Sequence, residues 1–217
     1  GSGVHGIQPG AVSITNVTEA GTVHSVAEVA ALSAIARAHG LPVHMDGARF
    51  ANALVATGAS PAEMTWQAGV DVLSFGGTKN GCMGVEAVVI FDPARAWEFE
   101  LRRKRGGHLQ SKHRFLSAQM VGYLEDGLWL RLAAHANTMA ARMARGLAQM
   151  PGVTLRPAVD ADILFPEWDA GMHERLSAAG AEYYPGAAPK GREAARLVTG
   201  WSTTEADVDG FLAALRG

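Results

Sequence analysis

Cysteine is nearly absent from this sequence of 217 residues, with Cys82 as its only copy. A single cysteine cannot form an internal disulfide, which excludes a disulfide-stapled fold and fits a reducing compartment. Cys82 lies between Gly81 and Met83, and no partner base is evident beside it. That setting favours a packing role over a nucleophilic one.

Strong charge of either sign and long apolar runs are also missing. The formal net charge is −2, and no basic stripe interleaved with aromatic residues occurs, so a nucleic-acid partner is not expected. The sequence shows no signal-peptide pattern and no apolar run long enough to cross a bilayer. We therefore expect a cytoplasmic protein without a membrane partner, and no metal site is predicted.

The first part of the chain alternates short apolar runs with helical spacing. Strands are predicted at residues 12–16, 42–46, 70–75 and 86–91, and a helix at 25–40 that begins with a capping box of Ser25 and Glu28. Strands separated by helices favour a mostly parallel sheet with right-handed crossovers, an α/β architecture.

The second part has a different pattern. Residues 115–150 are predicted to be helical with a break at Asp126-Gly127, and Pro151-Gly152 follows. Strands at 153–156, 163–165, 181–184 and 196–201 with helices at 172–179 and 205–215 indicate a small α+β domain with a mostly antiparallel sheet. We therefore divide the chain into a large domain, residues 1–150, and a small C-terminal domain, residues 151–217.

Two charged residues fall at the carboxyl ends of predicted strands, where active groups of parallel sheets gather. Asp46 ends the second strand, and Lys79 follows the third in the run Gly76-Gly77-Thr78-Lys79-Asn80-Gly81. A pyridoxal phosphate enzyme needs this pair: the amine forms a Schiff base with the cofactor aldehyde, and the carboxylate keeps the pyridine nitrogen protonated. The pattern therefore predicts pyridoxal 5'-phosphate as the cofactor.

Three sequence blocks together resemble the low-specificity L-threonine aldolases of the fold-type I pyridoxal phosphate enzymes. They are residues 44–50 (His-Met-Asp-Gly-Ala-Arg-Phe), residues 75–81 around Lys79, and Arg196-Leu197-Val198-Thr199. The resemblance covers essentially the whole chain. It implies a fold-type I large domain, a small α+β domain, and cleavage of L-threonine or related β-hydroxy-α-amino acids to glycine and an aldehyde.

The resemblance also implies roles for individual residues. Lys79 is the Schiff-base lysine, and Asp46 is the partner of the pyridine nitrogen. Arg49 lies near the cofactor and the substrate carboxylate, and Arg196 clamps that carboxylate with its planar guanidinium. Two further residues are expected to bind cofactor: Thr78 beside the lysine, and Lys112, in a loop similar to the one that reaches a neighbouring subunit's cofactor phosphate. The shared site implies a homo-oligomer, a dimer or a tetramer.

Simpler structural roles compete with some of these assignments. Asp46 could cap a helix, Arg49 could be a solvated helix charge, and Arg196 could lie on the surface. His44 lies on a predicted strand with alternating neighbours. A structural histidine whose ring nitrogens are hydrogen-bonded explains this position at least as well as an acid–base group does.

The chain departs from the family pattern in two places. Thr18 stands near the position where many family members have a histidine, and a water or His24 could replace that group in the proton step. The usual N-terminal portion, with the glycine-rich phosphate cup and the histidine that stacks on the pyridine ring, has no counterpart in the sequence.

The sequence is therefore compatible with four functions. The first is the aldolase reaction, and the second is a β-elimination catalysed with the same cofactor. The third is an inactive fragment without the phosphate cup. The least favoured is a nucleotide-binding domain, suggested by the apolar strand that ends at Asp92, because the glycine-rich segment lacks the order of a P-loop.

Overall fold

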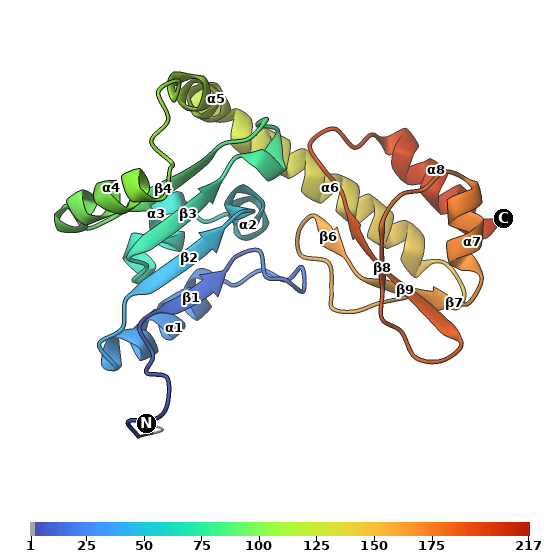
Figure 1. Cartoon of the computed structure of the whole chain (residues 1–217). Coiled ribbons are helices and arrows are strands. Elements are labelled where there is room, and N and C mark those ends of the chain that lie inside the picture. The colour runs from blue at the N-terminus through green and yellow to red at the C-terminus, as the bar shows by residue number, and fades with distance from the viewer. Residues whose placement is uncertain (1–2) are drawn as a thin grey trace.

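A computed structural model describes residues 3–217, which form two sheets joined by a long helix (Figure 1). The elements are β1 (Val12–Thr15), α1 (Val26–Ala38), β2 (Val43–Gly47), α2 (Phe50–Thr57), α3 (Pro61–Met64), η1 (Trp66–Ala68), β3 (Val72–Gly76), η2 (Thr78–Asn80), β4 (Glu86–Ile90), η3 (Pro93–Arg95), α4 (Ala96–Arg105), α5 (Arg114–Leu124), η4 (Glu125–Gly127), α6 (Leu128–Ala148), β5 (Thr154–Leu155), β6 (Ile163–Leu164), β7 (Pro166–Asp169), α7 (Met172–Ala178), β8 (Tyr184–Gly186), β9 (Arg192–Val198) and α8 (Glu205–Arg216).

The first sheet has the strand order β1-β2-β3-β4. β1, β2 and β3 pair in parallel, as expected, and their register places Asp46 opposite Thr15 on one side and Ser74 on the other. The sheet is thus mostly parallel, as expected, and within it β4 runs antiparallel to β3. The physical reason is the connection: the short turn around η2 returns the chain directly, whereas a parallel strand needs a long crossover.

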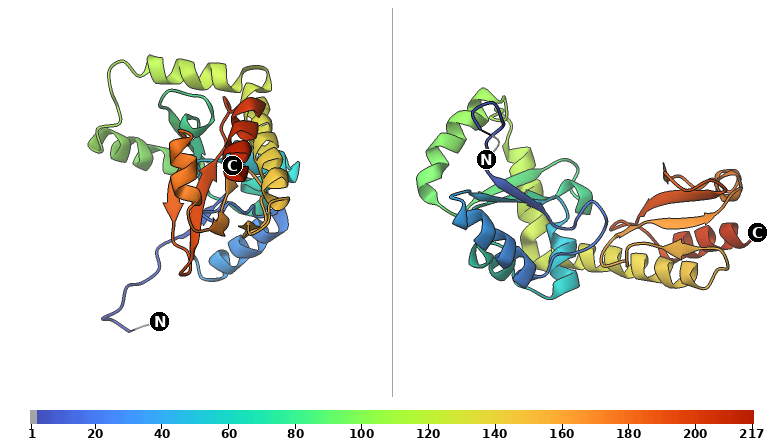
Figure 2. Two further views of the ribbon diagram at one scale, coloured as in Figure 1. Left: turned by 90° about the vertical axis from the view of Figure 1, so that its right-hand side faces the viewer. Right: turned by 90° about the horizontal axis from the view of Figure 1, so that it is seen from below.

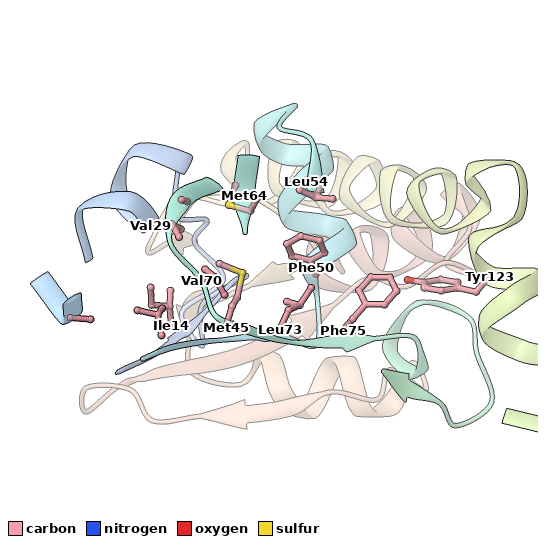
Figure 3. Close-up of a cluster of buried hydrophobic side chains, with 13 residues drawn as sticks. Ile14, Val29, Met45, Phe50, Leu54, Met64, Val70, Leu73, Phe75 and Tyr123 are labelled. Carbon is pink, nitrogen blue, oxygen red and sulfur yellow. The ribbon is translucent and has the colours of Figure 1, made fainter. Parts of the chain in front are cut away.

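Helices α1, α2 and α3 cover one face of this sheet, and apolar side chains fill the space between them (Figure 3). Met45 of β2, Val29 of α1 and Met64 of α3 are fully buried there. The predicted capping box of α1 is present, with the Ser25 side chain accepting from the backbone N–H of Glu28. Burial of this face stabilises the layer that carries Asp46, because apolar area is removed from water.

The predicted helical break at residues 126–127 is present. Asp126 and Gly127 have φ values of 49° and 70°, and this left-handed turn separates α5 from α6. The 21-residue helix α6 then runs from the core of the first sheet to the second sheet (Figure 2). Its first turns pack on the core of the first sheet through Trp129 and Leu132, and its last turns bury Met143 and Leu147 in the core of the second.

The second sheet, which includes β5 to β9, is antiparallel throughout, as expected. The element boundaries differ from the prediction. The last strand covers Arg192–Val198 and not 196–201, the strand expected at 181–184 is β8 at Tyr184–Gly186, and β7 was not predicted. Proline at both Pro166 and Pro185 obscured these strands, because proline usually marks an edge or a strand end.

Within residues 3–217, no helix has both the length and the apolar character needed to cross a membrane.

Candidate active site

Asp46 lies near the end of β2, on the sheet face turned away from α1, α2 and α3. Strand alternation causes this orientation: Val43, Met45 and Gly47 are buried against the helices, while His44 and Asp46 are half-buried on the other face. One carboxylate oxygen of Asp46, Oδ1, accepts a hydrogen bond from the backbone N–H of Ala48 at 3.0 Å. The side chain therefore stays partly accessible while its orientation is held by the loop that follows.

Lys79 lies in η2, directly after β3, and its side chain is exposed. The loop that carries it touches the loop after Asp46, since a Cβ added at Gly76 would collide with the backbone of Ala48. Only glycine permits this approach. The structure thus brings the Asp46 and Lys79 loops into contact at the carboxyl end of neighbouring parallel strands, as the sequence predicted.

The residue after Lys79 anchors its loop in the protein interior. Asn80 is 4% exposed, and its Nδ2 donates to the Tyr123 hydroxyl at 2.7 Å and to the Trp129 carbonyl at 2.8 Å. The Tyr123 hydroxyl in turn donates to the carbonyl of Gly76 at 3.4 Å. This buried network ties the lysine turn to α5 and α6. The sequence did not predict this network, because each of its hydrogen bonds joins residues more than 40 positions apart.

The pKa of Tyr123 gives a test of this network. Burial raises it from 10.0 to about 12, against the opposing effect of the hydrogen bond from Asn80. In the unfolded chain the phenol ionises near pH 10, so the folded state binds more protons between pH 10 and 12 and stability falls as pH rises through that window. We expect Tyr123→Phe to reduce this alkaline loss by up to about 2 kcal/mol. Urea unfolding of both proteins at pH 9 and pH 11.5 measures the loss of stability between the two pH values. An equal loss in the two proteins would contradict the prediction.

His44 is fixed by the two strands beside it. Its Nδ1 lies 2.8 Å from the Ser13 hydroxyl and its Nε2 lies 2.8 Å from the Ser74 hydroxyl. Both ring nitrogens are therefore satisfied across the sheet. This geometry supports a structural histidine and leaves no free nitrogen for acid–base chemistry.

Arg49 directly precedes α2, and its side chain pairs with a residue far along the chain. Its Nε donates to Asp162 Oδ2 at 2.8 Å, and the side chains of Arg49 and Asp162 are 12% and 6% exposed. The solvated helix charge considered from the sequence is therefore ruled out by this burial. Asp162 was not predicted as a site residue, and its place before a short apolar strand carries no local signal for it.

Arg196 lies in β9 and borders a cavity of about 420 Å³ between β8, β9 and α8. Its guanidinium carbon is 6.0 Å from the centre of the Tyr184 ring. Three residues further on, the buried Thr199 donates its backbone N–H to the carbonyl of Asp162 at 3.0 Å. The strand with Arg196 is thereby connected to Asp162, the partner of Arg49.

The end of this strand also approaches the lysine loop. The Trp201 ring lies against Gly81, 3.7 Å from the position that a Cβ there would take. The turn after β9 therefore contacts the turn that carries Lys79.

The remaining predicted site residues differ in their placement. Thr78 is exposed beside Lys79, and its hydroxyl donates to the carbonyl of Val85 at 3.3 Å. Lys112 is exposed in the turn before α5, and the structure does not bring it to Asp46 or Lys79. Burial raises the pKa of the Cys82 thiol, with Glu86 adding to the effect, so the reactive thiolate is disfavoured.

Comparisons with known proteins agree with this geometry. The chain is 45% identical over 213 residues to the low-specificity L-threonine aldolase of a Pseudomonas species, covering 98% of this chain and 61% of that protein. Identity to the low-specificity L-threonine aldolase of Pseudomonas aeruginosa is 44% over 200 residues, covering 92% and 57%. The chain thus spans about three fifths of the length of these relatives.

Solved structures show the same fold. The threonine aldolase of Leishmania major superposes with a TM-score of 0.90 at 32% identity, covering 98% of this chain and 62% of that one. A pyridoxal phosphate-bound putative aminotransferase of Clostridium difficile, at 14% identity, matches with a TM-score of 0.71 over 95% of this chain and 57% of its own, which shows the fold alone. The beta-eliminating lyase family model matches residues 1–167, and the chain belongs to this family.

Proposed function

We propose that this chain forms part of a pyridoxal phosphate-dependent aldolase that cleaves L-threonine or a related β-hydroxy-α-amino acid to glycine and an aldehyde. The observation that carries the proposal is the contact between the Asp46 and Lys79 loops at the carboxyl ends of β2 and β3. The relatives named as low-specificity L-threonine aldolases, at 44–45% identity, support this reaction over others of the same cofactor.

The residues present fit pyridoxal phosphate by their chemistry. An exposed primary amine at Lys79 and a half-buried carboxylate at Asp46 are the two groups that the cofactor requires, and they come from adjoining strands. The bound cofactor supplies an aldehyde that accepts an amine and a ring that takes up electrons from a breaking bond. Asp46 would hold the proton of the ring nitrogen, and Lys79 would hold the cofactor covalently through Nζ.

Two arginines, Arg49 and Arg196, would bind the substrate. Arg49 and Arg196 offer planar guanidinium groups that bind a carboxylate with paired hydrogen bonds. Thr78, which is exposed beside Lys79, would also contribute to cofactor binding. With the carboxylate held, the substrate is oriented relative to the cofactor, which converts binding energy into a favourable reacting geometry.

A homo-oligomer, a dimer or a tetramer, belongs to this proposal. Helix α5 packs on the core of the first sheet through Tyr123 and exposes three large apolar side chains, Phe115, Val121 and Leu124. These exposed apolar side chains are available for contact with a neighbouring copy. Lys112, in the turn that precedes α5, would then reach the cofactor phosphate of a neighbouring copy. We also propose a cytoplasmic location, on the basis of the single, unpaired cysteine.

An assay of the products tests the proposed reaction. The purified chain is incubated with pyridoxal phosphate and L-threonine, and acetaldehyde, glycine, 2-oxobutanoate and ammonia are measured. Acetaldehyde with equimolar glycine supports the aldolase. A keto acid with ammonia would instead establish the β-elimination alternative, and the absence of every product would favour the inactive fragment.

Asp46→Asn gives a sharper prediction about the ring-nitrogen partner. A neutral amide cannot stabilise the protonated ring, so we expect kcat to fall by about 10²- to 10³-fold while attachment to Lys79 persists. The matched control is Asp92→Asn, an exposed residue after β4 whose side chain accepts from the backbone N–H of Ala94 at 3.0 Å. Unchanged kcat in Asp46→Asn would refute the role of Asp46.

A further inference from the structure

The segment of residues 160–163 connects the two sheets at the candidate site. Asp160 Oδ2 accepts from the backbone N–H of Val23 at 3.1 Å, and Ala161 is buried against Val17 and Ala53. Asp162 lies in the middle of this anchored segment and is 4% exposed. The backbone of Asp162 is therefore held in place by contacts other than the one with Arg49.

The Asp162 carboxylate has one hydrogen-bond partner within residues 3–217, the Nε of Arg49 at 2.8 Å. Its other oxygen, Oδ1, is buried without a partner in the described part of the chain. A buried carboxylate in this state depends on the neighbouring cation, and the cation is held by it in turn. The pair therefore fixes the plane of the Arg49 guanidinium.

Arginine has five N–H donors in a planar fork. Asp162 occupies the Nε edge, and no other side-chain hydrogen bond of Arg49 occurs among residues 3–217. The two terminal nitrogens, Nη1 and Nη2, remain as a pair of parallel donors at the opposite end. This is the geometry that an amino-acid carboxylate accepts in a bidentate manner.

We propose that Asp162 is a positioning residue that orients Arg49 so that Nη1 and Nη2 face the carboxylate of the amino-acid substrate. The proposal rests on the function proposed above, because it deepens the role of Arg49 in that site. Asp162 also joins the two arginines: its carboxylate holds Arg49, and its carbonyl accepts from Thr199, at the end of the strand with Arg196. Asp162 touches neither substrate nor cofactor in this role.

The first test reads the orientation of Arg49 without any cofactor. Proton–nitrogen NMR of the arginine Nε–H groups is recorded on the chain, with the Arg49 signal identified by its loss in Arg49→Lys. We expect a slowly exchanging signal whose exchange accelerates by about tenfold or more in Asp162→Ala. Asp162→Asn keeps an acceptor oxygen and should retain most of the protection.

Two further variants serve as controls for the interpretation of the Arg49 exchange rate. Asp160→Ala removes the neighbouring anchor to Val23 without touching Arg49, so its Arg49 signal should match that of the unmodified chain. Asp162→Leu, which is close to aspartate in shape and has no acceptor, replaces Asp162→Ala if the latter does not fold. An unchanged Arg49 exchange rate in the folded Asp162 variant without an acceptor would overturn the proposal.

The second test measures the consequence for substrate binding in the cofactor-loaded protein. We expect Asp162→Ala to raise KM for L-threonine by about tenfold with a smaller change in kcat, and Asp162→Asn to restore KM to within a few-fold. A merely structural role would lower activity and stability without this selective recovery. If the unmodified protein cleaves no threonine, the proposed function fails, while the NMR experiment still decides whether Asp162 positions Arg49.

Discussion

Lys79→Ala is expected to abolish covalent attachment of pyridoxal phosphate and to lower kcat on the order of 10³-fold or more. The amine that condenses with the cofactor aldehyde must lie at the carboxyl end of the sheet, near the group that pairs with the ring nitrogen. The chain has four lysines, and the structure brings Lys79 alone among them to the loop in contact with the Asp46 loop. The three others lie on α4, before α5 and before β9.

Borohydride reduction followed by peptide mapping measures this attachment. The cofactor mass should appear on the peptide that contains Lys79 in the unmodified protein and should be lost in Lys79→Ala. Lys190→Ala removes an exposed lysine from the second half of the chain and serves as the control. Attachment that persists in Lys79→Ala, or that maps to Lys190, would refute the assignment.

Arg49→Met is expected to destabilise the folded chain by about 3–5 kcal/mol, because the buried Asp162 carboxylate loses its cationic partner. The two side chains are 12% and 6% exposed, so water cannot replace the lost ion pair without rearrangement. For a chain of this length the change corresponds to a decrease in Tm of about 6 to 20 °C.

A double mutant separates the pair from its surroundings. Arg49→Met with Asp162→Leu replaces both charges by apolar groups of similar size, which is often neutral for stability. We therefore expect the double variant to recover most of the stability lost in Arg49→Met, measured by urea unfolding of all four proteins. Arg142→Met, which breaks the more exposed ion pairs with Asp209 and Glu205, is the control and should reduce stability far less than Arg49→Met. A double variant no more stable than Arg49→Met would contradict the pairing.

Much of the first sheet follows from local sequence patterns. The capping box of Ser25 and Glu28, the break at Asp126-Gly127, the strand with Asp46 and the strand before Lys79 were all predicted, and all are present. These features depend on hydrogen bonds and backbone preferences within a few residues, or on strand periodicity that is visible in a short window. The division of the chain after residue 150 and the roles of the site residues stay predictions.

The short strands of the second sheet were harder to place. β5 and β6 have two residues each, so alternation cannot be read from them, and Pro166 and Pro185 lie inside β7 and β8. Such strands form because their neighbours offer hydrogen bonds and a buried surface. Their boundaries are therefore decided by tertiary contacts.

By itself, the sequence determined that a carboxylate lies at the end of one strand and that a lysine follows a neighbouring strand of a mostly parallel sheet. Only the tertiary structure decided how this edge is completed: Arg49 meets Asp162 across 113 residues, and Asn80 meets Tyr123 across 43 residues. The physical reason is that the strength of such pairs comes from burial. A charge or an amide becomes dependent on one partner only after folding has removed its access to water.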